Sequence, residues 1–276
     1  MPRDRNRDLA FAYPARWSRR QRCVGTMRRS IPPVEHRFFR YDRIDSTNER
    51  ALVAIAAGRA AHGDVHVALE QTAGRGRRGR SWRSARGEGL TLTLVLLPAR
   101  APNPSALTMG AGLAVVEAVI ALGAREARLK WPNDVLVDER KLAGILVEAR
   151  GLEPAHAVVG VGLNVAQHAF APELVKERPV TSLALLGVRC SLAEAEQTLL
   201  VALARRMAEA CERAESVARD YAADLGLLGR AVRVSVGHEP GQGHIMRLAL
   251  DGIELAREDS GVERIPLEHV QALEGC

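Results

Sequence analysis

Cysteine, lysine and aromatic residues are scarce in this chain of 276 residues. The four cysteines form no C-x-x-C pair, which argues against a zinc site or a disulfide framework. They are Cys23, Cys190, Cys211 and Cys276. We therefore expect reduced thiols and a cytoplasmic protein. No run of about 18 apolar residues stands out as a membrane-spanning helix, so we also expect no membrane segment.

Arginine supplies nearly all of the positive charge. Only three of the 39 basic residues are lysine, namely Lys130, Lys141 and Lys176, and the net charge is +6. This balance favours anionic partners such as nucleotides, nucleic acids or acidic protein surfaces, without choosing among them. In a chain that uses arginine so freely, each lysine suggests a role for a compact ammonium group.

Composition divides the chain into three parts. Residues 1–34 are rich in arginine and lack apolar periodicity, so we expect a disordered basic tail, and Met27 is a second candidate for the start. Residues 35–225 alternate apolar strands with helical stretches, which predicts an α+β domain. Residues 226–276 contain short alternating strands with glycine turns, a pattern typical of a small β-barrel.

Periodicity predicts several individual elements in the middle part. A strand near Phe38–Ile44 precedes a helix, and Ser46 with Glu49 fits a capping box at its start. Ser105–Leu122 reads as a helix buried on most sides, and a helical region near 191–225 contains a break or bend around 213–217.

The stretch "QTAGRGRRGRSW", Gln71–Trp82, combines four arginines with three glycines and no acidic residue. Glycine lets the backbone approach a ligand closely, and arginine supplies donors for phosphate or carboxylate. The residues are consistent with an anion-binding loop, a nucleic-acid contact or a solvated basic loop. A P-loop sequence is absent, and the strand expected after Trp82 disfavours a Rossmann turn, which would open a helix. Trp82 could stack on a base or fill the core.

Two further stretches carry candidate residues. "KWPND" precedes "RKLAGILVE", and short strands joined by a bend would bring Asn133 close to Lys141. An ammonium there can neutralise phosphate or carboxylate, although a surface hairpin lysine fits equally well. Asn164 ends the apolar strand "VVGVGLNV", where a buried asparagine often serves only to satisfy backbone groups.

Four stretches occur in a fixed order: "DSTNE", "EQTAGRGRRGRSW", "KWPNDVLVDERKLAGILVE" and "VGVGLNV". With this order and spacing, the chain resembles the biotin protein ligases, also called biotin–[acetyl-CoA-carboxylase] ligases. The resemblance runs from near Ile44 to the C-terminus. It implies an α+β fold, with a mixed-sheet catalytic domain of the biotin/lipoate ligase type at 35–225 and a small SH3-like β-barrel domain at 226–276.

The resemblance also implies a two-step reaction. Biotin and ATP give biotinyl-5′-AMP and pyrophosphate, with Mg²⁺ as cofactor, and biotin then passes to a lysine of a biotin carboxyl carrier domain. A carboxylate must approach a polyanionic triphosphate, so cationic donors are needed. No Ser-His-Asp or Cys-His arrangement stands out, so positioning is expected to matter more than a protein nucleophile.

Residue roles follow from the resemblance by motif. Arg77 and Lys141 match the residues with the main electrostatic, catalytic roles. The positions that match biotin-binding residues are Ser46, Thr47, Asn48, Gln71, Arg75, Gly76, Arg77 and Lys141. Those that match ATP- or adenylate-binding residues are Arg75, Arg77, Trp82, Asn133, Lys141 and Asn164, of which Asn164 also matches a residue near the metal. No metal ligand is assigned.

The family's repressors carry a winged helix-turn-helix before the STN motif. Only 45 residues precede Ser46, and they begin with the basic tail, so we expect a ligase without that domain and without specific DNA binding. A homodimer is compatible with the resemblance. A lipoate or octanoyl ligase is the close alternative, which the combination of the loop, "KWPND" and the C-terminal β domain disfavours. A nucleic-acid-binding module remains the alternative from another class.

Overall fold

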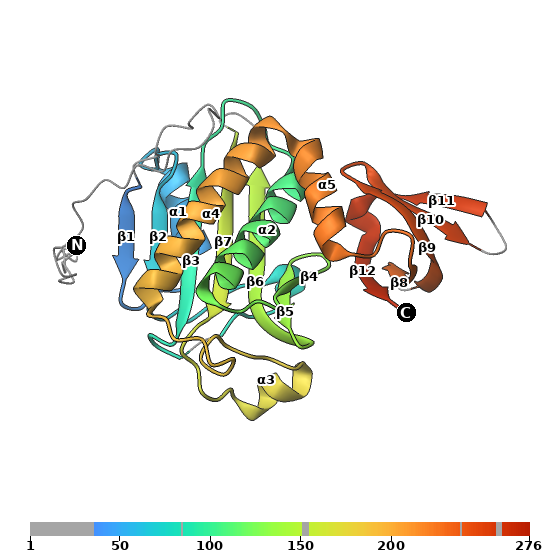
Figure 1. Ribbon diagram of the computed structural model, residues 1–276. Helices are drawn as coiled ribbons and strands as arrows, with labels where there is room; N and C mark the ends of the chain where they lie inside the picture. The colour runs from blue at the N-terminus through green and yellow to red at the C-terminus, as the bar shows by residue number, and fades with distance from the viewer. Residues whose placement is uncertain (1–35, 84, 151–154, 238, 258–260) are drawn as a thin grey trace, which may run out of the picture. The chain divides into compact units, whose positions relative to one another are not determined.

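A mixed seven-stranded sheet lies at the centre of the computed structural model, which describes residues 36–83, 85–150, 155–237, 239–257 and 261–276. The strand order is β1-β2-β3-β7-β6-β5-β4, with β1 and β2 parallel and all other neighbours antiparallel (Figure 1). The strands are β1 (Phe38–Tyr41), β2 (Val65–Ala68), β3 (Gly89–Leu96), β4 (Arg128–Lys130), β5 (Asp134–Val137), β6 (Arg140–Arg150) and β7 (His156–Asn164).

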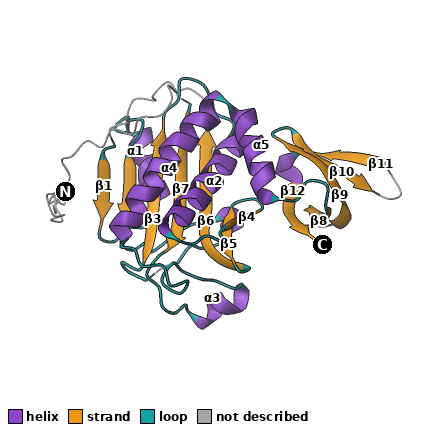
Figure 2. Cartoon of the chain, in the orientation of Figure 1, coloured by secondary structure: helices purple, strands orange, loops and turns teal. Residues whose placement is uncertain are grey.

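Helices cover both faces of this sheet. The helices are α1 (Thr47–Ala56), α2 (Pro104–Leu122), α3 (Pro172–Glu177), α4 (Leu192–Glu212) and α5 (Ala214–Leu225), with short 3-10 turns η1 (Arg77–Gly79) and η2 (Leu267–His269). In Figure 2, α2 and α4 cross the front of the sheet and α1 lies behind it. Every residue of β3 is buried, because helices pack on both of its sides.

Helix α2 is the predicted buried helix. It also bears on the expectation that no segment of the chain could span a membrane. Asn103 caps it by accepting from the backbone amides of Ser105 and Ala106, and Gly123 ends it in a left-handed conformation. The helix is long and apolar enough to cross a membrane by length and composition, contrary to our expectation. However, 67% of that apolar window is buried inside the protein, which is the pattern of a core helix.

The predicted capping box at Ser46 is wrong. Helix α1 does begin after Ser46, but the serine side chain makes no capping hydrogen bond. Instead the backbone N–H of Thr47 donates to Oε1 of Gln71, from the loop that follows β2, at 2.7 Å. A distant side chain therefore replaces the local cap.

The predicted bend in the C-terminal helical region is present. Arg213 separates α4 from α5 and has a non-helical backbone conformation. Ser191 and Glu194 form the reciprocal capping box of α4, which was not predicted from the sequence.

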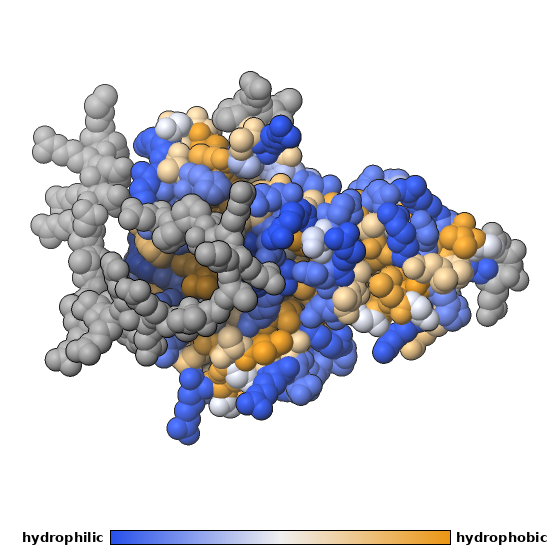
Figure 3. Space-filling model, turned by 45° about the horizontal axis from the view of Figure 1, so that its top comes forward, coloured by the Kyte–Doolittle hydropathy of each residue, from blue (hydrophilic) through white to orange (hydrophobic). Residues whose placement is uncertain are grey.

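The C-terminal strands form a separate five-stranded antiparallel sheet in the order β11-β10-β9-β8-β12. They are β8 (Ala231–Val236), β9 (Glu239–Ala249), β10 (Gly252–Arg257), β11 (Gly261–Ile265) and β12 (Val270–Gly275). Met246 and Val262 leave apolar side chains exposed on this sheet, where Figure 3 shows orange surface. The two sheets confirm the predicted α+β fold. The predicted basic tail at 1–34 lies outside the described residues, and Val34–Cys276 forms one unit, so the three-part domain division stays a prediction.

A buried histidine lies in the parallel strand pair of β1 and β2. His66 on β2 is buried, and its ring stacks on Phe39 of β1 at a centroid distance of 4.8 Å. Its Nδ1 lies 3.0 Å from the Tyr41 hydroxyl, whereas Nε2 has no hydrogen-bond partner among the described residues. Burial lowers the pKa of His66 to about 4, because a charged ring would lose its hydration.

We expect His66 to make folding stability depend on pH. The unfolded histidine takes up a proton near pH 6.5 and the folded one only near pH 4, so protonation favours the unfolded chain. Stability should therefore fall as pH decreases from about 6.5, with His66 contributing a loss of roughly 2 kcal/mol between pH 7 and pH 5. Urea unfolding at pH 7 and at pH 5 measures the free energy of unfolding. The difference between the two pH values should be smaller in His66→Gln than in wild type by that amount. The same substitution at exposed His168 should leave the difference unchanged.

Candidate active site

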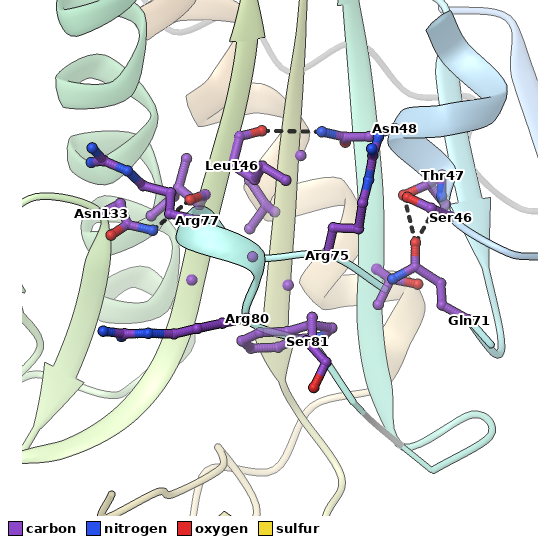
Figure 4. A pocket seen from close by; sticks show the side chains of 18 of the residues that line it. Ser46, Thr47, Asn48, Gln71, Arg75, Arg77, Arg80, Ser81, Asn133 and Leu146 are labelled. Carbon is purple, nitrogen blue, oxygen red and sulfur yellow. Dashed lines mark hydrogen bonds between the residues drawn. The ribbon is translucent and has the colours of Figure 1, made fainter. Parts of the chain in front are cut away.

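A pocket opens on the α1 side of the large sheet, and the predicted motifs converge on it (Figure 4). It is lined by the start of α1, the loop after β2, and parts of β3, β5, β6 and β7. The polar and glycine residues of the lining are Ser46, Thr47, Asn48, Gln71, Arg75, Gly76, Arg77, Arg80, Ser81, Thr91, Asn133, Asp134, Lys141, Gly144, Gly160, Gly162 and Arg178, and Trp82 lies among them.

The floor of the pocket is backbone, because glycines occupy its face of β7. A Cβ atom at Gly160 would lie 2.3 Å from Oδ1 of Asn48, and one at Gly162 would lie 2.2 Å from the Trp82 ring. No real Cβ approaches other atoms so closely, so both side chains lie directly on the strand only because these positions are glycine.

One wall consists of the residues at the start of α1 and the side chains that they contact. The Thr47 amide and hydroxyl lie 2.7 and 3.0 Å from Oε1 of Gln71. Thr93 of β3 is fully buried, and its hydroxyl lies 2.8 Å from the Thr47 hydroxyl and 2.7 Å from Oδ1 of Asn48. These contacts hold the wall rigidly beside the pocket.

Two polar groups in this wall remain available to a ligand. Since the Thr47 N–H is a donor, the Gln71 atom that faces it is the oxygen, so the Gln71 amide nitrogen points elsewhere. Across the described hydrogen bonds, neither that nitrogen nor the Ser46 hydroxyl is used. The wall therefore presents one donor and one hydroxyl group to the pocket.

The glycine–arginine loop, Gln71–Trp82, forms a short hairpin over the floor of the pocket. Gly76 N–H donates to the Arg80 carbonyl at 2.7 Å, and Trp82 N–H donates to the Gly74 carbonyl at 2.9 Å. Within it Arg78 has a left-handed backbone conformation, with φ of 58°, and its side chain turns outward to Gln271. In Figure 4 the side chains of Arg75, Arg77 and Arg80 extend along the pocket.

Lys141 is buried at the other end of the pocket. Its ammonium forms an ion pair with Asp134 and lies 5.7 Å from the centre of the Trp82 ring. Burial lowers the pKa of Lys141, and the Asp134 carboxylate opposes that shift. A strand bulge explains the geometry: the register changes between Val135 and Leu136, so that Lys141 pairs with Leu136 and shares the face of Asp134.

The KWPND turn is supported from distant parts of the chain. Asn133 donates through Nδ2 to the Ile145 carbonyl at 2.7 Å, which joins the turn to β6. The buried Tyr221 of α5 donates its hydroxyl to the Pro132 carbonyl at 3.3 Å. The indole N–H of Trp131 donates to the Val270 carbonyl of β12 at 3.2 Å. The turn is therefore positioned by tertiary contacts.

A smaller hollow adjoins the pocket behind Trp82. It is lined by Ser81, Trp82, Arg83, Lys141, Asn164, Leu174, Arg178 and Val180. Two side-chain nitrogens of its lining, Nε1 of Trp82 and Nε of Arg178, are buried without a hydrogen-bond partner among the described residues, as are Oγ1 of Thr181 and Oε1 of Gln167 nearby. Unpaired buried polar atoms are rare in proteins, so their grouping here indicates a place for a polar ligand or for water.

All but one of the sequence-predicted site residues line the main pocket. The exception is Asn164, which is buried beside the smaller hollow and donates through Nδ2 to the Thr181 carbonyl at 2.9 Å. Two residues of the lining, Asp134 and Arg178, are not predicted from the sequence, whereas Arg80 is one of the loop arginines predicted to supply donors. Asp134 is the last residue of the KWPND motif, so its carboxylate is a signal that the sequence contains. Arg178 had none, because the chain uses arginine throughout.

Known proteins resemble this chain in sequence. Residues 41–164 match the Biotin/lipoate A/B protein ligase family. The biotin–[acetyl-CoA-carboxylase] ligase of Mycobacterium tuberculosis is 38% identical over 212 residues, which is 75% of this chain and 76% of that protein. The bifunctional ligase/repressor BirA of Escherichia coli is 40% identical over 141 residues. That match covers 50% of this chain and only 43% of BirA, so the chain spans less than half of the length of that relative.

The fold has solved counterparts. A structure described as the biotin protein ligase from Aquifex aeolicus in complex with biotin and ATP aligns with a TM-score of 0.72 at 27% identity. The alignment covers 87% of this chain and 99% of that one. Together, the motif order, the sequence identity over three quarters of the chain and the shared fold show that the chain belongs to the biotin protein ligase family.

Proposed function

We propose that this protein is a biotin protein ligase that joins biotin to ATP as biotinyl-5′-AMP and then transfers biotin to a lysine of a biotin carboxyl carrier domain. The observation that carries the proposal is the pocket itself, which combines a neutral polar end with a strongly cationic end. Biotin, with its neutral ureido ring and its carboxylate, matches that polarity. The Aquifex structure with biotin and ATP and the name of the Mycobacterium relative support the same substrates.

The neutral end would take the ureido ring. The Ser46 hydroxyl and the Gln71 amide nitrogen border the pocket, and Gly160 leaves room above the strand. Ring N–H groups need acceptors and the ring carbonyl needs donors, which a hydroxyl and an amide can supply. In the rigid wall described above, these groups would meet the ring without a large entropic cost.

The cationic end would bring the two anions together. Lys141 is buried there, and Arg77, Arg80 and Arg178 line the same region. A carboxylate oxygen of biotin attacks the α-phosphorus of ATP, a new P–O bond forms, and the bond to pyrophosphate breaks. The attacking group is already an anion, so no protein base is required. Positive charge at this point offsets the repulsion between the reactants and the negative charge of the transition state.

The nucleotide base would lie near Trp82, whose ring packs on Gly162 and whose indole N–H lacks a partner among the described residues. In the second step a carrier lysine amine attacks the acyl carbon, AMP departs as the leaving group, and the amine loses a proton. The hairpin of Gln71–Trp82 covers the pocket floor and would limit access of water to the mixed anhydride.

The family resemblance also implies Mg²⁺. No group of three or more His, Cys, Asp or Glu side chains suited to a metal occurs among the residues that the structure describes. A single carboxylate in the pocket, Asp134, nevertheless suits this ion, which usually binds one or two carboxylates together with substrate phosphates and water. Mg²⁺ bound there would supply charge neutralisation for the phosphates. The carrier protein, a cytoplasmic location and a homodimer belong to the same proposal.

The proposed function is tested with the purified protein and labelled pyrophosphate. We expect pyrophosphate to exchange into ATP when biotin is present, and a biotin carrier domain incubated with biotin and Mg-ATP to gain one biotin by mass spectrometry. Exchange with lipoate and none with biotin would assign the protein to the other branch of the family. Tight duplex DNA binding without biotin would support the nucleic-acid alternative.

Lys141→Ala should slow biotin-dependent pyrophosphate exchange by about 100-fold or more, because a buried cation that faces developing charge is lost. The free energy of unfolding should change little. Without the lysine, the Asp134 carboxylate still borders the open pocket, and Nη1 of Arg178 lies 3.8 Å from its Oδ2. Lys176→Ala, at an exposed position of α3, serves as the matched control and should behave as wild type. Normal exchange in Lys141→Ala would remove this lysine from the catalytic machinery.

Arg77→Ala should weaken biotin and ATP binding about tenfold, because a charge-assisted hydrogen-bond donor is removed from the pocket. The adenylate should also leave the protein faster, as measured by the release of labelled biotinyl-5′-AMP after rapid dilution. An unchanged biotin affinity together with an unchanged release rate would contradict the role of this arginine.

Gly162→Ala should affect the nucleotide end of the pocket more than the biotin end. The added methyl group would lie 2.2 Å from the Trp82 ring, so the indole must move. We expect clearly weaker ATP binding in calorimetry, while biotin binding near Gly160 changes less. Equal losses for both ligands would contradict the placement of the nucleotide base at Trp82.

A further inference from the structure

A closed circuit of hydrogen bonds surrounds the neutral end of the pocket and begins and ends in the glycine–arginine loop. Gln71 accepts from Thr47, the Thr47 hydroxyl lies beside that of Thr93, and Thr93 lies beside Asn48. Asn48 then donates through Nδ2 to Oε2 of Glu148 at 2.8 Å. The same carboxylate oxygen accepts from Arg75 at 3.3 Å, which returns the circuit to the loop.

Glu148 belongs to this circuit although it does not line the pocket. It lies on β6 opposite Val158 of β7, beyond the lining of the pocket. Its residue number is even, as are those of Gly144 and Leu146, so all three side-chain positions share the site face of β6. Its side chain is 29% exposed, and one of its oxygens serves both Asn48 and Arg75.

Asn48 uses both of its amide hydrogens within the protein. Its amide nitrogen donates to Glu148 and, at 3.3 Å, to the Leu146 carbonyl, which uses both hydrogens. Its oxygen lies 2.7 Å from the Thr93 hydroxyl. A carboxamide with both donors occupied holds its neighbours in place, so Asn48 connects the wall to Glu148 and offers no free donor to a ligand.

Arg75 connects the loop to α1 and to β6. One guanidinium nitrogen, Nη2, lies 3.0 Å from Oε2 of Glu49 in the first turn of α1 and 3.3 Å from Oε2 of Glu148 on β6. Figure 4 shows this side chain running toward Asn48. The arginine is 44% exposed, and ion pairs at such positions contribute little to folding stability.

We propose that Glu148 is a positioning residue for biotin binding, because its carboxylate fastens Arg75 of the loop to Asn48 of the pocket wall. The inference rests on the proposed function and deepens it. The loop carries Gln71 and Arg77, so a tether at Arg75 sets the position of both relative to the floor. Without it, ligand binding must order a looser loop, and that entropy opposes binding.

The test compares Glu148→Gln with Glu49→Gln. Glutamine keeps the size of the side chain but removes the charge that Arg75 needs. Glu49 also contacts Arg75 but has no described hydrogen bond to Asn48, so Glu49→Gln is the matched control for loss of one carboxylate. Glu148→Gln should bind biotin about tenfold more weakly, Glu49→Gln less than about threefold, and both should keep the wild-type melting temperature.

Two measurements separate a positioning role from a merely structural one. Hydrogen–deuterium exchange of the loop peptide 72–82, without ligand, should be faster in Glu148→Gln than in wild type or Glu49→Gln. In addition, Arg75→Ala should remove most of the effect of Glu148→Gln on biotin affinity, because the two residues act through one contact.

Several outcomes would overturn the proposal. Biotin affinity within twofold of wild type in Glu148→Gln would do so, as would fully additive effects with Arg75→Ala, or a loss of affinity that merely follows a lower melting temperature. If the wild type binds no biotin at all, the proposed function fails separately. In that case faster exchange of the ligand-free loop in Glu148→Gln still supports the tether, and unchanged exchange refutes it.

Discussion

Bare backbone on the site face of β7 is the constraint on which the active site depends. Side chains normally stand out from both faces of a strand, and a pocket floor made of them would exclude both Asn48 and Trp82. At Gly160 and Gly162 the strand has no side chains, so these two groups lie directly on it. The opposite face of β7 remains apolar and packs in the main core, so the missing side chains create the floor without removing the support beneath it.

The charges of the site follow from what surrounds this floor. At one end, neutral groups satisfy one another through Thr47, Thr93 and Gln71, and their contacts leave particular atoms available. At the other end, Lys141 is removed from water and is ion-paired with Asp134. A cation in such surroundings interacts strongly with an incoming anion, because little water screens it. The charge of the pocket therefore changes along its length, from neutral at one end to positive at the other.

The sequence anticipated most of the elements because their signals are local. The buried helix α2, the break at Arg213 and the strands with their glycine turns all depend on neighbouring residues. It failed where distant residues intervene. Ser46 has the local pattern of a capping residue, but Gln71 takes its place. The length and apolarity of α2 would also suit a membrane span, but the helix lies in the core, as its sequence pattern predicts.

By itself the sequence determined the order of the motifs, the glycines of the loop and strand, and the scarcity of lysine that drew attention to Lys141. The tertiary structure decided which side chains meet. A bulge between β5 and β6 turns Lys141 to the face of Asp134, and tertiary contacts bring Glu148 of β6 beside Asn48 of α1 and Arg75 of the loop. Such contacts join residues up to 100 positions apart. Their geometry depends on register and packing, which a linear pattern of residue types does not specify.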